Sequence, residues 1–124
     1  MEAFPCFQDD PSIPNTEFLL RTIHSDFIKQ GCVSSGAFHS STDRHVSVDR
    51  HSLSSPEQSL ARRPKHVGVV QLLTGFVRGL GLAVASDPLP ENPAHALIVE
   101  AAQSKKIAKQ LATACTWALG PRNA

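Results

Sequence analysis

The sequence contains no tyrosine, a single tryptophan, one methionine and only three cysteines in 124 residues. Three cysteines without a Cys-x-x-Cys pair predict neither a disulfide framework nor a structural zinc site, so we expect reduced thiols. The chain also lacks any apolar run near the roughly 18 residues that span a membrane, and its acidic, proline-containing start is unlike a signal peptide. These absences indicate a soluble, cytoplasmic protein with no membrane partner.

A strong net charge is missing as well, since 12 lysines and arginines stand against 11 aspartates and glutamates. Such a balance gives no strong signal for binding nucleic acid. The charges are nevertheless unevenly placed, because residues 1–26 hold five acidic side chains and a single basic one, Arg21. What the chain does have is a globular composition, with 41% hydrophobic and 19% charged residues, which is typical of a folded domain.

Prolines indicate how the chain is divided. Three of them fall within residues 1–16 and disfavour a helix, so we expect an irregular N-terminal tail there. Residues 17–120 have the patterned composition of a single α+β domain, and residues 121–124 are expected to fray at the C-terminus.

Strands are predicted where apolar residues run together or alternate with polar ones, at residues 17–23, 45–51, 82–86 and 95–100. Residues 66–81 combine clustered valines with helical spacing, and whether they begin as strand or helix stays open.

Two helices are expected. A short one covers residues 56–63, and a longer amphipathic one follows Ser104, with an apolar stripe made by Ile107, Leu111, Ala114 and Ala118. Together the elements predict an α+β fold: a small, mostly antiparallel sheet of four or five strands, with the C-terminal amphipathic helix and a shorter helix packed on it.

The most chemically suggestive spacing belongs to His39, His45 and His51, which recur every six residues. A zinc site needs nitrogens that converge at about 2 Å, whereas six residues of strand separate Cα atoms by roughly 20 Å. We therefore predict no metal site and regard these histidines as polar surface residues.

Two other residues are better placed for a site. Arg21 lies inside the predicted strand FLLRTI, where an arginine needs a partner, and we expect Asp49, Glu100 or an anionic ligand. His95 follows DPLPENP at a loop-to-strand junction, where an imidazole either faces a binding site or orders its own loop. Structural and functional roles stay open for both residues.

The segments LLRTI, SSGAF, VSVD and DPLPENPAHALIV, followed by a Lys/Ala-rich helix, resemble a family of short bacterial proteins of uncharacterised function. The resemblance covers residues 18–118, and NPAHA is its most distinctive part. It implies a bacterial or phage origin, and small proteins of this kind are often partner subunits of multi-component systems, including toxin–antitoxin and defence systems.

With no convergent acid–base set in the sequence, we expect a non-catalytic protein-interaction subunit with a protein partner and no cofactor. A homo-oligomer is compatible with this expectation. Ser47 belongs with Arg21 and His95 among the candidate ligand-binding residues, because it lies on the polar face of the alternating strand VSVDR.

An alternative comes from a second resemblance. Arg21, then Ser40, Ser41 and Thr42, then Glu100 follow one another in the order of the motifs of ADP-ribosyltransferases. This resemblance implies an enzyme with NAD as its substrate. Arg21 would bind phosphate or ribose, the three hydroxyls would shape the pocket, and Glu100 would act on the reacting ribose. The candidate catalytic residues are then Arg21, Glu100 and His95.

Overall fold

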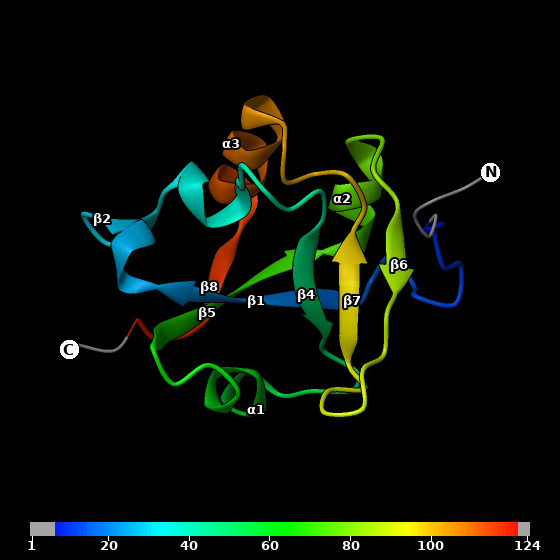
Figure 1. The fold of residues 1–124 in the computed structure, drawn as a ribbon, viewed down its shortest axis with the longest axis horizontal. Helices are drawn as coiled ribbons and strands as arrows, with labels where there is room; N and C mark the ends of the chain where they lie inside the picture. Colours follow the sequence, from blue (N-terminus) through cyan, green and yellow to red (C-terminus); the bar gives the residue numbers. More distant parts are fainter. Residues whose placement is uncertain (1–6, 122–124) are drawn as a thin grey trace.

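The computed structural model describes residues 7–121, and its centre is a six-stranded sheet in which every neighbouring pair of strands is antiparallel (Figure 1). The strand order across the sheet is β6-β7-β4-β1-β5-β8. The strands are β1 (Phe18–His24), β4 (Val46–Arg50), β5 (His66–Leu73), β6 (Val84–Ser86), β7 (His95–Ile98) and β8 (Thr116–Leu119).

Shorter elements connect these strands. After β1, the 3-10 turn η1 (Ser25–Phe27) leads into a small hairpin of β2 and β3, which the 3-10 turn η2 follows. The bounds of these three elements are Ile28–Lys29, Cys32–Val33 and Ser35–Phe38. The helices are α1 (Pro56–Ala61), α2 (Thr74–Gly79) and α3 (Lys105–Ala114).

Helices cover both faces of the sheet (Figure 1). On one face, α2, α3 and η2 enclose the main core, which includes Phe38, Leu111 and Val77, all with 0% exposure. On the other face, α1 covers a smaller cluster of Leu20, Leu60 and Val69. Successive residues of a strand point to opposite faces, so β1 supplies side chains to both clusters.

The expected α+β fold with a mostly antiparallel sheet is confirmed, and so is the inward alternation of Val46 and Val48, which are 1% and 3% exposed. The open question about residues 66–81 is answered by β5 followed directly by α2. Strand is favoured at the start because the β-branched valines of β5 pack on both faces of a central strand.

The sheet has one strand more than the four or five expected, and the additional strand is β8. The apolar stripe predicted to run on to Ala118 stops with α3 at Ala114, and Ala118 lies in β8 instead. Thr116 and Trp117 pair with Gln71 and Val70, because β5 offers an unpaired edge to β-branched and aromatic residues that favour strands.

A glycine makes room for this last strand. A Cβ atom at Gly68 would lie only 2.6 Å from the ring of Trp117 and 3.0 Å from the carbonyl oxygen of Leu119. The absence of a side chain therefore lets the tryptophan lie close against β5.

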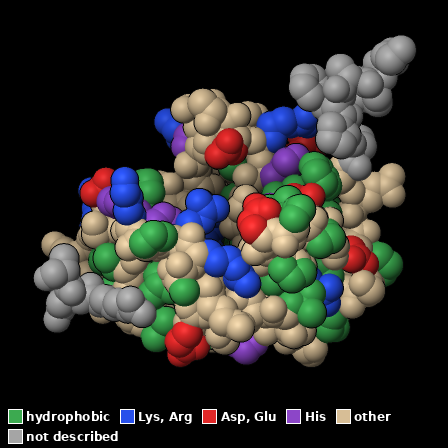
Figure 2. Space-filling model, turned by 60° about the horizontal axis from the view of Figure 1, so that its bottom comes forward, with side chains coloured by type: hydrophobic (Ala, Val, Ile, Leu, Met, Phe, Trp, Pro, Cys, Tyr) green, Lys and Arg blue, Asp and Glu red, His purple; other side chains and the backbone are tan. Residues whose placement is uncertain are grey.

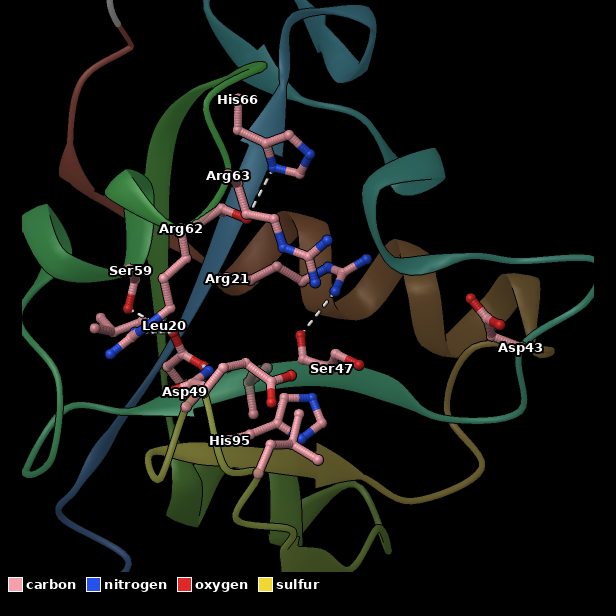
Figure 3. Close-up of a pocket in the computed structure, with 15 residues that line it drawn as sticks. Leu20, Arg21, Asp43, Ser47, Asp49, Ser59, Arg62, Arg63, His66 and His95 are labelled. Atoms are coloured by element: carbon pink, nitrogen blue, oxygen red, sulfur yellow. Dashed lines mark hydrogen bonds and ion pairs between the residues drawn. The ribbon is translucent and has the colours of Figure 1, made fainter.

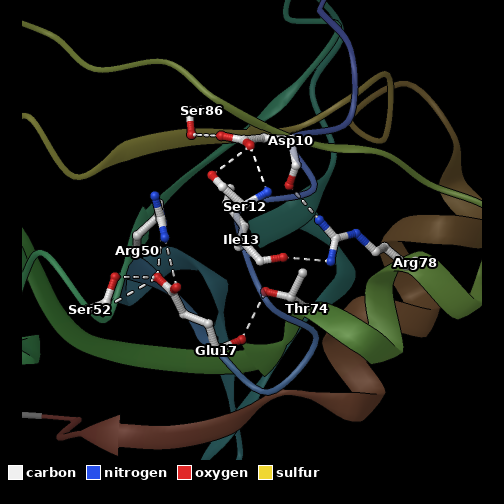
Figure 4. Close-up of polar contacts among 9 residues, drawn as sticks. All are labelled: Asp10, Ser12, Ile13, Glu17, Arg50, Ser52, Thr74, Arg78 and Ser86. Carbon is white, nitrogen blue, oxygen red and sulfur yellow. Dashed lines mark hydrogen bonds and ion pairs between the residues drawn. The ribbon is translucent and has the colours of Figure 1, made fainter.

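The N-terminal segment preceding β1 has no helix or strand from residue 7 to residue 16, yet it is firmly attached to the domain. Ile13 is fully buried in the main core. Arg78 of α2 donates hydrogen bonds to the carbonyl oxygens of Ile13 (2.7 Å) and Asp10 (2.8 Å) (Figure 4). It also donates one to the carboxylate of Asp9 (2.9 Å). The remainder of the expected tail, residues 1–6, and residues 122–124 of the expected frayed terminus lie outside the described residues.

Within residues 7–121, no helix has the length and apolarity that crossing a membrane requires.

Candidate functional site: a polar cleft beside α1

A cleft of about 480 Å³ opens on the face of the sheet that carries α1 (Figure 3). Side chains of β1, β4, β5 and β7 line it, together with residues at the end of α1 and in the loop before β7. Figure 2 shows basic and acidic side chains gathered around a hollow on this face. Its volume falls within the roughly 300–1,000 Å³ of small-molecule sites.

The cleft exists because two central strands separate. β1 and β4 share only two residue pairs, Leu19↔Arg50 and Leu20↔Asp49. Beyond Leu20, β1 remains paired with β5, but its other edge no longer meets β4. Arg21 is the first residue past this point, and its side chain occupies the gap.

Arg21 replaces the missing strand–strand hydrogen bonds with its own. Its guanidinium group donates to the carbonyl oxygen of Ser47 on β4 (2.7 Å) and to that of Ala37 in η2 (2.8 Å). It also lies 5.7 Å from the ring centroid of the buried Phe38, a cation–π arrangement. Arg21 thus ties β1, β4 and η2 together at the floor of the cleft.

The charge of Arg21 is poorly compensated. Neither expected carboxylate is its partner, and within residues 7–121 no acidic side chain forms an ion pair with it. Burial, together with the like charge of Arg63, lowers the pKa of Arg21 to about 10, although Asp43 opposes this effect. A guanidinium group with a lowered pKa is one that a bound anion would stabilise.

Two further basic groups face the same part of the cleft. Figure 3 shows the side chains of Arg63 and Arg21 extending toward one another, with His66 beside them. Nδ1 of His66 lies 2.8 Å from the hydroxyl oxygen of Thr22. Burial, followed by the positive charge of Arg63, lowers the pKa of His66 below its ordinary value. We call Arg21, Arg63 and His66 the cationic cluster.

Acidic side chains line the rest of the cleft, where Asp43, Asp49 and Glu91 face it. Asp49 accepts hydrogen bonds from Ser59 (2.6 Å), Arg62 (3.2 Å) and Asn92 (2.8 Å), so its carboxylate is fully occupied by side chains of α1 and the adjoining loops. This explains why Asp49 does not reach Arg21: its oxygens hold α1 and the loop before β7 against the sheet.

His95 contributes to the cleft from β7. Its Nδ1 lies 3.0 Å from a carboxylate oxygen of Asp87 and 3.1 Å from the carbonyl oxygen of the same residue. The other ring nitrogen is left for the cleft, which His95 lines. His95 can therefore order its own loop through one ring nitrogen and face a ligand with the other, so the two roles considered for it do not exclude each other.

The structure brings together three of the predicted site residues, Arg21, Ser47 and His95, which all line the cleft. It does not bring Glu100 to them. Glu100 follows β7 in an exposed turn and forms a 2.7 Å ion pair with Arg44.

The hydroxyl residues of the predicted NAD pocket are also elsewhere. Ser40 caps a local turn by accepting the backbone N–H groups of Thr42 (3.1 Å) and Asp43 (2.9 Å), and neither Ser41 nor Thr42 lines the cleft. An arginine–hydroxyl–glutamate site of the ADP-ribosyltransferase type is thus not assembled among these residues.

No group of three or more His, Cys, Asp or Glu side chains is placed to hold a metal ion within residues 7–121. Of the three regularly spaced histidines, His45 has a structural role: its Nδ1 accepts a hydrogen bond from the backbone N–H of Glu100 (2.9 Å).

Sequence reasoning missed Arg63 and His66. They lie in RRPKH, a basic cluster that the sequence alone presents as a solvated surface. The informative signal was Pro64, which prevents α1 from continuing, because the chain then returns to the sheet and both Arg63 and His66 line the cleft.

Neither a known protein-family model, nor a curated protein, nor a solved structure matches this chain.

Proposed function

We propose that this protein is a non-catalytic binding module that recognises an anionic group, of the phosphate, sulfate or carboxylate type, in the cleft beside α1. The observation that carries the proposal is the cationic cluster, in which Arg21 and Arg63 lie together without an ion-pairing carboxylate from residues 7–121. Like charges held together at a concave site favour an oppositely charged ligand, and guanidinium groups bind planar and tetrahedral oxyanions through two donors.

The neighbouring polar groups are better suited to binding a ligand than to catalysing a reaction. Ser47, Thr22 and His95 add hydrogen-bonding capacity around the cluster. Asp49, the most enclosed carboxylate of the cleft, is occupied by three donors and is poorly suited to act as a base. The resemblance to small bacterial subunits of multi-component systems adds the suggestion that the anionic group belongs to a protein partner.

The test is the thermal stability of the full chain with sulfate, pyrophosphate, citrate and NAD at constant ionic strength. A ligand that binds only the folded state raises the melting temperature by mass action. We expect sulfate and pyrophosphate to raise the melting temperature. We expect Arg63→Gln to weaken binding by at least about tenfold, because a charge-assisted hydrogen bond contributes about 1.5–3 kcal/mol.

Arg63 is the variant of choice because its side chain is exposed, whereas Arg21 also holds the sheet together. Lys65→Gln is the matched control, since Lys65 is a neighbouring exposed cation that does not line the cleft. Equal binding by the wild type and Arg63→Gln, or no shift with any anion, would refute the proposal. A shift with NAD alone that Glu100→Gln removes would favour the NAD-handling alternative.

A further inference from the structure

A second hollow lies on the opposite side of the sheet, between α2 and α3. It has a volume of about 460 Å³ and is lined by Phe76 of α2, by Leu80 directly after α2, and by Lys106, Gln110, Thr113 and neighbouring residues of α3. Phe76 is 41% exposed, an unusual position for a large aromatic side chain. We call this hollow the α2–α3 groove.

The residues that form each wall of the groove are spaced as on one side of a helix. Phe76 and Leu80 are four residues apart on one wall, and Lys106 and Gln110 are four residues apart on the other. Residues with this spacing line up along one side of a helix, so the two walls form ridges with a channel between them. A channel of this kind accepts the apolar ridge of a third helix.

The charged residues that line the groove are all cationic. α3 carries three lysines and no acidic residue, whereas Arg78 of α2 is paired with Asp9. Lys106 and Lys109 line the groove directly, and both side chains are exposed. Within residues 7–121, neither lysine forms an ion pair.

From the apolar channel and its cationic rim, we propose that the α2–α3 groove docks an amphipathic helix of a protein partner whose apolar ridge is flanked by glutamate or aspartate. The apolar ridge covers Phe76 and Leu80, and the acidic flank meets Lys106 and Lys109. This site is independent of the cleft, because the two share no lining residue.

A helix fits the observations better than an anionic membrane does. The apolar atoms line a hollow, whereas insertion into a bilayer relies on apolar side chains that project from a surface. Complementary charge on a docked helix would also set its orientation in the channel.

The experiment measures fluorescence anisotropy of a labelled peptide with the full chain. The peptide has about 14 residues, roughly four turns of helix, with leucine on one ridge and glutamate on both flanks, and its matched partner has lysine in place of each glutamate. We expect the acidic peptide to bind at least about tenfold more tightly than the lysine peptide, and its binding to weaken as salt rises.

The variant Lys106→Glu/Lys109→Glu should reverse this preference, and Phe76→Ala should weaken binding of both peptides. Leu53→Ala is the control, because Leu53 is 53% exposed but lies outside the groove. These residues are exposed, so circular dichroism should show an intact fold in every variant.

Three results would overturn the proposal. The first is equal binding of the two peptides, and the second is unchanged binding by the double variant. The third is binding of phosphatidylserine vesicles that depends on both lysines while the acidic peptide does not bind.

Discussion

Glu17 and Arg50 form a two-point ion pair in which Oε2 and Oε1 of the glutamate accept hydrogen bonds of 3.0 and 2.9 Å from the guanidinium group (Figure 4). Their side chains are only 6% and 17% exposed. Ser52 adds a third hydrogen bond, of 2.8 Å, from its hydroxyl group. The pair joins the residue before β1 to the last residue of β4, so it fastens two central strands beside the point where their pairing begins.

Replacing Glu17 with glutamine should therefore destabilise the fold. The change leaves a largely buried Arg50 without its counter-charge, and we expect the free energy of unfolding to fall by about 3 kcal/mol. Urea denaturation measures this loss. Glu91→Gln, at an exposed position that forms no ion pair within residues 7–121, should stay within about 0.5 kcal/mol of the wild type. Similar stabilities of the two variants would show that the ion pair contributes little.

Acid should destabilise the protein through Asp10. Hydrogen bonds from Ser86 and Ser12 lower the pKa of Asp10 to about 2. The folded state thus favours the charged form, and the resulting stabilisation is present above the ordinary pKa near 4 and is lost as the pH falls toward 2. Urea unfolding at pH 7, 4 and 3 should show a smaller decline for Asp10→Asn than for the wild type. Parallel declines would contradict this assignment.

Anion binding in the cleft should strengthen as the pH falls through the titration of His66. Burial and the charge of Arg63 lower the pKa of His66, with smaller contributions from His24 and Arg21, so the empty cleft favours the neutral ring. A bound anion favours the protonated ring, and linkage then requires tighter binding at lower pH. Sulfate is the suitable ligand, because its own charge stays constant between pH 8 and pH 5.5, values chosen on either side of the ordinary histidine pKa of about 6.5.

Calorimetric titrations with sulfate at both pH values measure this dependence. His66→Gln should flatten it, whereas His51→Gln, at an exposed position away from the cleft, should retain it. A pH dependence that survives in His66→Gln would show that His66 is not the responsible group.

Loss of the Arg78 side chain should release the N-terminal segment. Arg78 makes four hydrogen bonds to residues 9–15, and no substitute offers the same set of donors. We expect Arg78→Gln to lower the free energy of unfolding by about 2–3 kcal/mol and to accelerate hydrogen exchange at the amide of Ile13. Exchange of Ile13 at the wild-type rate would show that the buried isoleucine alone holds the segment.

Much of the fold follows from local pattern. The alternation around Val46 and Val48 and the start of the short helix at Pro56 could be predicted, because each depends on neighbours a few residues away. β8 could not be predicted, because Ala114 and Ala118 continue a helical stripe in the sequence. The chain forms a strand there because β5 has an open edge and Gly68 leaves space beside it. Such tertiary effects are invisible in a single sequence.

The site was predictable only in part, for a related reason. Arg21 stood out because a charge within an apolar strand requires a partner, and Ser47 and His95 followed from strand alternation and loop chemistry. The missing information was the separation of β1 from β4, which decides that Arg21 binds carbonyl groups and not a carboxylate. Register between distant strands cannot be read from composition or spacing.

The position of β1 has a consequence for taking the molecule apart. β1 lies between β4 and β5, both of which follow it in the chain, and the exposed turn at Gln30 and Gly31 separates it from them. A break at that turn would yield a short fragment carrying the central strand and a long fragment with a slot where the strand belongs. Neither fragment would contain the complete sheet, so refolding on mixing would show that the two fragments had associated. The domain is therefore a suitable starting point for a two-fragment complementation reporter.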